Sequence, residues 1–137
     1  LSALYGAISP DECVKPYRLD LTMNLKVEGE TLKKYWKERI VSSFEKGECI
    51  VNLASSEFSA LFNKKQYDWL DVDFYEKKEG ALKQHSTISK KARGKMAAWI
   101  VLHQIQDKAE LRNCDVDGYK FDESLSKENH YCFVKEV

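Results

Sequence analysis

The sequence has no net charge, no closely spaced cysteine pair and no long apolar run. Lysine plus arginine and aspartate plus glutamate both number 22, so the overall charge favours no class of partner. The four cysteines are far apart and form no C-x-x-C pair, which argues against a zinc site and for reduced thiols. No apolar run approaches 18 residues and no signal peptide is visible, so we expect a cytoplasmic protein without a membrane partner.

Signatures of several enzyme and repeat classes are also missing. The sequence contains no internal repeat, no low-complexity stretch, no glycine-rich phosphate loop and no H-E-x-x-H pattern. We therefore assign no metal and no cofactor.

The composition that remains is typical of a folded domain. The 137 residues are 43% hydrophobic and 12% aromatic, enough for one domain with its own core. The chain starts without Met, inside an apolar segment, and is therefore expected to be a fragment lacking an N-terminal part. We expect that Leu1, Leu4 and Tyr5 are then left uncovered, and that the fragment self-associates through them.

Charge is concentrated in one segment, residues 77–95. This segment carries seven cations against the single acid Glu79, which predicts a basic patch on a neutral domain. The cations are Lys77, Lys78, Lys83, Lys90, Lys91, Arg93 and Lys95.

The same segment leads into the most regular helical pattern of the chain. Apolar and aromatic residues recur there with the spacing of an amphipathic helix: Ala92, Met96, Trp99, Ile100 and His103. Ser86 and Ser89 are the available N-cap residues. We therefore expect the helix to open around the sequence Ser86–Lys95.

Two local rules are broken at this predicted helix start. Lys90, Lys91 and Arg93 would crowd the first turn, where the helix dipole disfavours cations by roughly 0.3–1 kcal/mol each. Gly94 costs about 1 kcal/mol relative to alanine. A bound anion would explain both features, because backbone N–H groups and cations would converge on it and glycine would allow close approach. The alternative is an ordinary solvated lysine face.

The remaining patterns alternate between strands and helices. They predict strands at 17–23, 49–54, 69–75, 82–85, 119–121 and 130–134, and helices at about 30–46 and 57–62. Gly80 and Asp117-Gly118 mark turns. The order indicates an α+β fold, a single domain with a mixed or largely antiparallel sheet and two main helices.

A small-residue turn follows the expected buried strand 49–54. Asn52 is unusual there, because a buried amide needs partners. Ser55 or Ser56 can cap the following helix, and Glu57 suits its positive end. Glu57 is thus either a residue that satisfies the helix dipole or a candidate acid.

Five motifs occur in the order seen in the YaaA family of peroxide-stress proteins, which the chain resembles over nearly its whole length. They are Leu4-Tyr5-Gly6, Pro16-Tyr17-Arg18-Leu19-Asp20, Asn52-Leu53-Ala54-Ser55-Ser56-Glu57-Phe58, Lys90-Lys91-Ala92-Arg93-Gly94 and Gly118-Tyr119-Lys120-Phe121. Asp20 stands where the family commonly has Glu, and Phe58 where it commonly has Tyr. The resemblance identifies residues 1–137 as the C-terminal portion of a YaaA-like domain.

The resemblance implies a cytoplasmic bacterial protein that limits oxidative damage, is linked to low free intracellular iron and binds DNA. It also implies an α+β fold with a positively charged cleft that contains the Lys-x-x-Arg-Gly motif. No established reaction comes with the family. The helix-hairpin-helix element associated with its DNA binding is expected in the N-terminal part, outside these residues.

Two functions remain open. The first is binding of the DNA phosphate backbone, with little sequence specificity, through Lys90, Lys91, Arg93, Gly94 and Lys95. The second is an enzyme acting on an anionic small molecule, with Glu57 as acid or base and Lys91 and Arg93 stabilising charge. We favour binding.

The first hypothesis carries a prediction about geometry. The expected cleft is formed by Tyr17, Arg18, Asn52, Ser55, Ser56 and Glu57. We expect Arg18, Asn52, Ser55 and Glu57 to converge with Lys91 and Arg93 on one concave surface.

Overall fold

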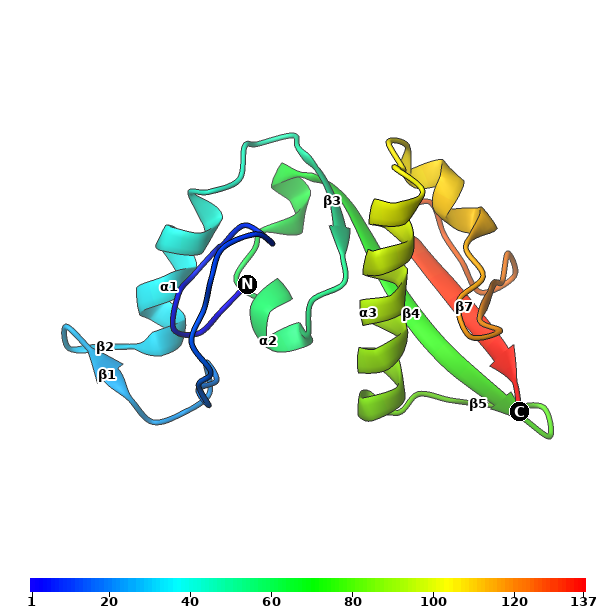
Figure 1. The fold of residues 1–137 in the computed structure, drawn as a ribbon, viewed down its shortest axis with the longest axis horizontal. Helices are drawn as coiled ribbons and strands as arrows, with labels where there is room; N and C mark the ends of the chain where they lie inside the picture. The colour runs from blue at the N-terminus through cyan, green and yellow to red at the C-terminus, as the bar shows by residue number, and fades with distance from the viewer. The chain divides into compact units, whose positions relative to one another are not determined.

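The computed structural model describes all of residues 1–137 and resolves two compact units (Figure 1). The first unit contains residues 1–48 and 54–68, and the second contains residues 49–53 and 69–137. No helix in either unit combines the length and the apolar character that crossing a bilayer requires.

The first unit is built around a short hairpin and a helix. Strands β1 (Lys26–Val27) and β2 (Glu30–Thr31) pair antiparallel, and β2 leads directly into α1 (Leu32–Val41). The Thr31 side chain accepts a hydrogen bond from the backbone N–H of Lys34, which caps the helix. The helix expected at about 30–46 is therefore present but shorter, and the hairpin before it was not predicted.

Two short helical segments complete this unit. They are α2 (Ser56–Ser59) and the 3₁₀ helix η1 (Lys64–Gln66). The buried core consists of small and aliphatic side chains: Ala3, Leu21, Leu32, Ile40 and Leu61.

The strand predicted at residues 17–23 is wrong, because this segment has no strand partner. Side-chain contacts hold the segment instead. The Tyr17 hydroxyl lies 2.5 Å from Ser2 Oγ, and the backbone N–H of Leu21 donates to Glu57 Oε1 at 2.9 Å. Apolar alternation describes which side chains are buried, but a strand also needs a neighbouring edge for its backbone hydrogen bonds.

The second unit is built on a five-stranded mixed sheet. Four of its strands lie in the order β3 (Cys49–Asn52), β4 (Asp68–Lys78), β7 (His130–Glu136) and β6 (Lys120–Phe121), while β5 (Ala81–Lys83) pairs with β4. The β4–β7 pair is parallel, whereas β4–β5 and β6–β7 are antiparallel. The predicted α+β class with a mixed sheet is confirmed.

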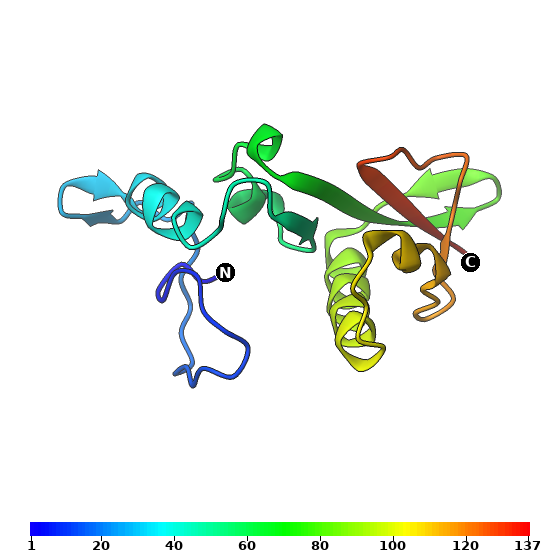
Figure 2. The ribbon, with the colours of Figure 1, turned by 90° about the horizontal axis from the view of Figure 1, so that it is seen from above.

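Alternation along the central strands creates the core of this unit. Leu70, Val72 and Phe74 of β4 are buried, as are Tyr131 and Phe133 of β7. Helix α3 (Ser86–Leu102) and the 3₁₀ helix η2 (Lys108–Asn113) lie on the same side of the sheet (Figure 2). They supply Ala92, Met96 and Leu111 to the same core.

Two features of this sheet differ from the prediction. The strand expected to be fully buried, β3, is an edge strand with Cys49 exposed and the rest half-buried. The η2 helix was not predicted, although Asp107 and Glu110 form a capping box at its start. The predicted hairpin turn is confirmed, with φ of 50° at Glu79 and 80° at Gly80.

Candidate functional site

The basic helix α3 begins earlier than its cations suggested. Ser86 is already helical, and the N-cap residue is His85, whose side chain makes no capping hydrogen bond. Ser89 is buried, and its hydroxyl has no partner. Both predicted N-caps are therefore wrong.

This start changes the position of the cations relative to the helix dipole. Since α3 begins at Ser86, Lys90, Lys91 and Arg93 all lie beyond the first turn. The dipole effect falls off within that turn, so the expected first-turn penalty does not apply. What remains unusual is the density of cations on a helix that itself carries no acidic residue.

Most of the cations of α3 form no ion pair within the chain. Lys90 and Lys91 are exposed and Arg93 is half-buried, and their side chains form no ion pair or hydrogen bond, unlike Lys95. Residues two apart on a helix differ by about 200° around the axis, so Lys91 and Arg93 lie on opposite flanks. Lys91 and Lys95 are four residues apart and share a flank.

Lys95 forms an ion pair with Asp117, which lies on the Asp117–Gly118 turn. The hydrogen bond from Lys95 lowers the pKa of Asp117 below its usual value. The turn was predicted from Asp-Gly, but nothing in the local sequence showed that its carboxylate meets α3. Lys95 is thus the one predicted contact residue whose charge is already balanced.

Gly94 lies in the interior of α3 and is exposed. A Cβ atom placed there would meet no other atom within 4 Å. Packing within the chain therefore does not require glycine at this position. The predicted close approach of a ligand or another backbone remains a prediction.

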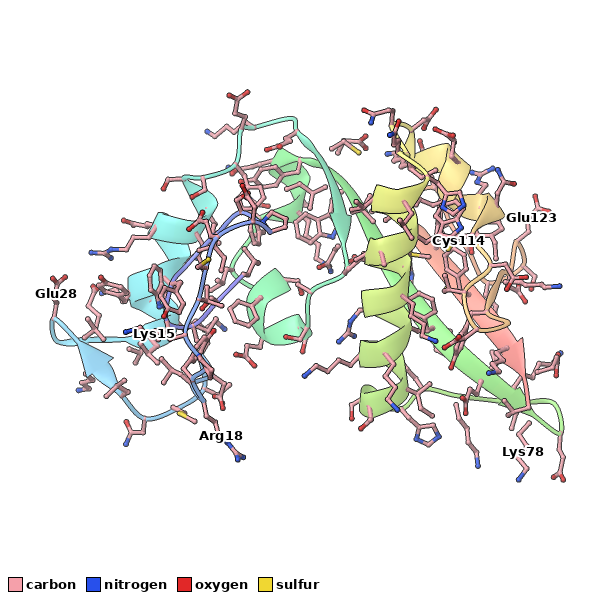
Figure 3. All side chains as sticks on the ribbon, viewed as in Figure 1. Lys15, Arg18, Glu28, Lys78, Cys114 and Glu123 are labelled. Carbon is pink, nitrogen blue, oxygen red and sulfur yellow. The ribbon has the colours of Figure 1, made fainter.

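In the first unit, the motif residues surround the start of α2. Ser55 is the N-cap without a side-chain capping bond, and Ser56 is the first helical residue. The exposed side chain of Arg18 points outward (Figure 3). These residues therefore present polar groups, but none is oriented by a tight network.

Glu57 has a clear structural role. It lies in the first turn of α2, and its Oε1 accepts the Leu21 backbone N–H at 2.9 Å. The carboxylate thus lies at the positive end of the helix, and its hydrogen bond holds the segment that contains Tyr17 and Arg18.

Asn52 belongs to the second unit, where its unusual position is explained. Its Nδ2 donates to Asp71 Oδ1 at 2.8 Å, and Trp69 Nε1 donates to the same oxygen at 2.8 Å. The predicted cleft residues are thus divided between the two units, with Asn52, Lys91 and Arg93 in the second. Their convergence with the others stays a prediction.

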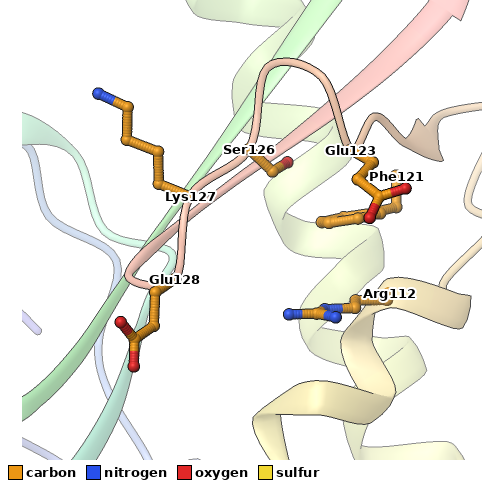
Figure 4. Close-up of a pocket in the computed structure, with 6 residues that line it drawn as sticks. All are labelled: Arg112, Phe121, Glu123, Ser126, Lys127 and Glu128. Atoms are coloured by element: carbon orange, nitrogen blue, oxygen red, sulfur yellow. The ribbon is translucent and has the colours of Figure 1, made fainter.

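The second unit also has a pocket of about 280 Å³ between η2 and the loop 122–129 (Figure 4). The Arg112 Nε–H donates to the Tyr131 hydroxyl at 3.2 Å, and the guanidinium lies near the Phe121 ring. Two cations and two carboxylates line the pocket, so its charge favours no polyanion. The lining residues are Arg112, Phe121, Glu123, Ser126, Lys127 and Glu128.

Burial disfavours the thiolate form of the two buried cysteines. Burial raises the pKa of Cys114 to about 11 and also raises the pKa of Cys132. The thiolate is the nucleophilic form, so both side chains are neutral thiols at physiological pH. Cys132 Sγ lies 3.8 Å from His130 Nε2, which is itself 2.8 Å from Asp73 Oδ2. This cluster was not predicted, because it forms only when β4 and β7 pair.

Comparison with known proteins gives a consistent result. The sequence profile of "Peroxide stress protein YaaA" matches residues 1–125. A UPF0246 protein of Francisella tularensis subsp. novicida (strain U112) is 37% identical, with the match covering 98% of this chain and 56% of the relative. A UPF0246 protein of Francisella philomiragia is 38% identical over the same shares. The chain therefore spans about half the length of these relatives, and it belongs to the YaaA family of peroxide stress proteins.

Proposed function

We propose that this peroxide-stress protein binds the phosphate backbone of DNA, or a similar polyanion, through the first half of α3. The observation that carries the proposal is that the side chains of Lys90, Lys91 and Arg93 form no ion pair within the chain. An exposed helix with unbalanced cations is an electrostatic footprint for nucleic acid.

The distribution of these cations favours an extended ligand over a single small anion. Lys91 and Arg93 lie on opposite flanks of α3, and Lys90 lies on the solvent-exposed surface between them. One phosphate group cannot contact both flanks, whereas successive phosphates of a backbone can. Such contacts position a duplex without reading its sequence.

Family membership supports further proposals that the geometry does not address. We propose, on that basis alone, a cytoplasmic bacterial protein whose action is linked to low free intracellular iron.

Salt-dependent DNA binding tests the proposal. Lys90→Ala and Lys91→Ala should each weaken binding to duplexes of unrelated sequence alike and reduce the salt slope by about one unit. Arg93→Lys should weaken binding although charge is kept, because lysine lacks the planar guanidinium fork. Fluorescence anisotropy between about 50 and 200 mM salt measures both quantities.

Lys33→Ala is the matched control, since Lys33 is exposed on α1 and carries the same charge. It should leave the slope unchanged. If the salt slope of DNA binding is the same for all four variants and the unmodified chain, the cations at the start of α3 form an ordinary solvated lysine face and do not bind DNA.

An enzyme acting on an anionic small molecule is the second candidate function. It would need Glu57 as acid or base, but the observed contact of Glu57 is with the Leu21 backbone. Glu57→Gln should preserve DNA binding in a binding protein and abolish turnover in an enzyme.

A further inference from the structure

The cations of α3 separate into two groups that face different surroundings. Lys91 and Lys95 share one flank, and the ion pair between Lys95 and Asp117 shows that this flank faces the 116–119 turn. Arg93 lies on the other flank. In the proposed function the two groups would therefore contact different phosphates, and the flank with Lys91 can be considered separately.

A third lysine approaches the same turn from the sheet. Lys135 of β7 has its Nζ 5.6 Å from the centre of the Tyr119 ring. A Cβ atom placed on Gly118 would lie 3.8 Å from Lys135 Cε. Lys135 thus lies beside the turn that carries Asp117, although it is 40 residues away from Lys95 in sequence.

One carboxylate is therefore surrounded by lysines from two elements. Asp117 pairs with Lys95, and the charges of Lys135 and Lys91 also lower its pKa. The other nearby carboxylate, Glu76, accepts a hydrogen bond from the Tyr119 hydroxyl at 3.2 Å. Glu76 also lies opposite Lys135 in the β4–β7 pairing. Three cations against the two carboxylates of Asp117 and Glu76 leave the cluster with one net positive charge.

We propose that Lys91, Lys95 and Lys135 form a phosphate subsite for the DNA backbone, and that Asp117 occupies this subsite until a phosphate displaces it. The inference rests on the proposed function and adds Lys135 and Asp117 to it. Exposed ion pairs are weak, so Lys95 can exchange the carboxylate for a phosphate oxygen. Asp117 then repels the bound phosphate and reduces affinity.

The change Asp117→Asn tests this role. Asparagine also tolerates the left-handed conformation seen at this position, with φ of 56°, so the turn is kept while the charge is removed. We expect roughly five-fold tighter binding to duplex DNA at low salt, the effect of one nearby charge in water. The salt slope should become steeper by about one unit.

Two further variants make the experiment decisive. Asp115→Asn removes the same charge from an exposed neighbour that forms no ion pair with these lysines and should change affinity less. Lys135→Ala should reduce the salt slope of DNA binding by about one unit. This variant tests the subsite even if Asp117→Asn does not fold normally.

The outcomes separate this inference from the proposed function. If Lys90→Ala weakens binding but Asp117→Asn behaves like Asp115→Asn and Lys135→Ala has no effect, the subsite is wrong and the DNA-binding proposal stands. If the unmodified chain and every variant fail to bind duplex DNA, both proposals are overturned.

Discussion

Gly6 shows how one residue determines the conformation of the N-terminal turn. Its φ is +80°, and the turn is closed by two backbone hydrogen bonds between Ser2 and Gly6. The Trp36 indole packs against this glycine and donates from Nε1 to the Ala3 carbonyl at 2.7 Å. Within the Leu4-Tyr5-Gly6 motif, Gly6 is thus the residue that makes a packing contact in the first unit.

We predict that Gly6→Ala destabilises the chain strongly. The new Cβ would lie 2.6 Å from Trp36 Cζ3, and the left-handed backbone costs about 1–2 kcal/mol for a non-glycine residue. Overpacking adds about 1–3 kcal/mol. The loss should appear as a lower urea midpoint for the cooperative unfolding of the first unit.

Gly29→Ala is the matched control for this change. Gly29 also has a φ of +80°, but a Cβ there would meet nothing within 4 Å. It should therefore show the backbone cost alone. Equal losses in the two variants would mean that the Trp36 contact adds nothing.

At the scale of the element, α3 combines a packed face with an exposed face rich in small residues and lysines. Ala92 and Met96 are buried against the sheet, while Gly94, Ala97 and Ala98 are exposed. Packing against the sheet explains the residue types on the buried face. No packing contact within the chain explains the small residues on the exposed face. The exposed face is therefore where a substitution can separate stability from binding.

Gly94→Ala is predicted to stabilise α3 and weaken DNA binding. The gain in helix propensity is about 1 kcal/mol, and no neighbouring atom opposes the new methyl group. If a DNA backbone approaches Gly94 closely, the same methyl group should reduce affinity. Thermal unfolding and DNA titration of one preparation measure both effects.

Ala98→Gly is the control for this experiment, because Ala98 lies one turn further along the exposed face of α3. It should lower stability by about 1 kcal/mol without changing affinity. A Gly94→Ala variant that is more stable and binds DNA normally would show that the glycine has no role in binding.

At the scale of the whole molecule, apolar surface and charge together favour association. Leu4 is 46% exposed, and its neighbours Leu1 and Tyr5 are exposed as well. The net charge is zero at pH 7, so little long-range repulsion keeps two copies apart. We propose that the chain self-associates through this apolar surface.

Sedimentation analysis at several concentrations should show a larger species that Leu4→Ser shifts toward the monomer. Leu102→Ser is the control, because Leu102 is 79% exposed at the end of α3 and receives the same change. Association that is lost only in Leu102→Ser would assign the contact to α3 instead.

The local sequence was sufficient to predict elements whose signals are short-ranged. The periodicity from Ala92 to His103, the glycine of the β4–β5 turn and the Asp117-Gly118 turn all depend on residues within a few positions. Backbone propensity and side-chain spacing act over the same distance. These predictions were confirmed for that reason.

Tertiary structure decided the features that depend on distant partners. Residues 17–23 alternate like a strand but have no edge to pair with, and β4 and β7 pair in parallel across a long connection. The same pairing places Lys135 beside the turn that carries Asp117, whose carboxylate meets Lys95 from 22 residues away. The periodicity of a segment indicates which of its side chains are buried, but it does not indicate which other segment pairs with it. Pairing between distant segments closes a long loop, and whether that loop forms depends on the contacts of the whole fold. The sequence alone therefore determined that the cations are concentrated in one helix, and only the fold determined where that helix begins and which of the cations are balanced.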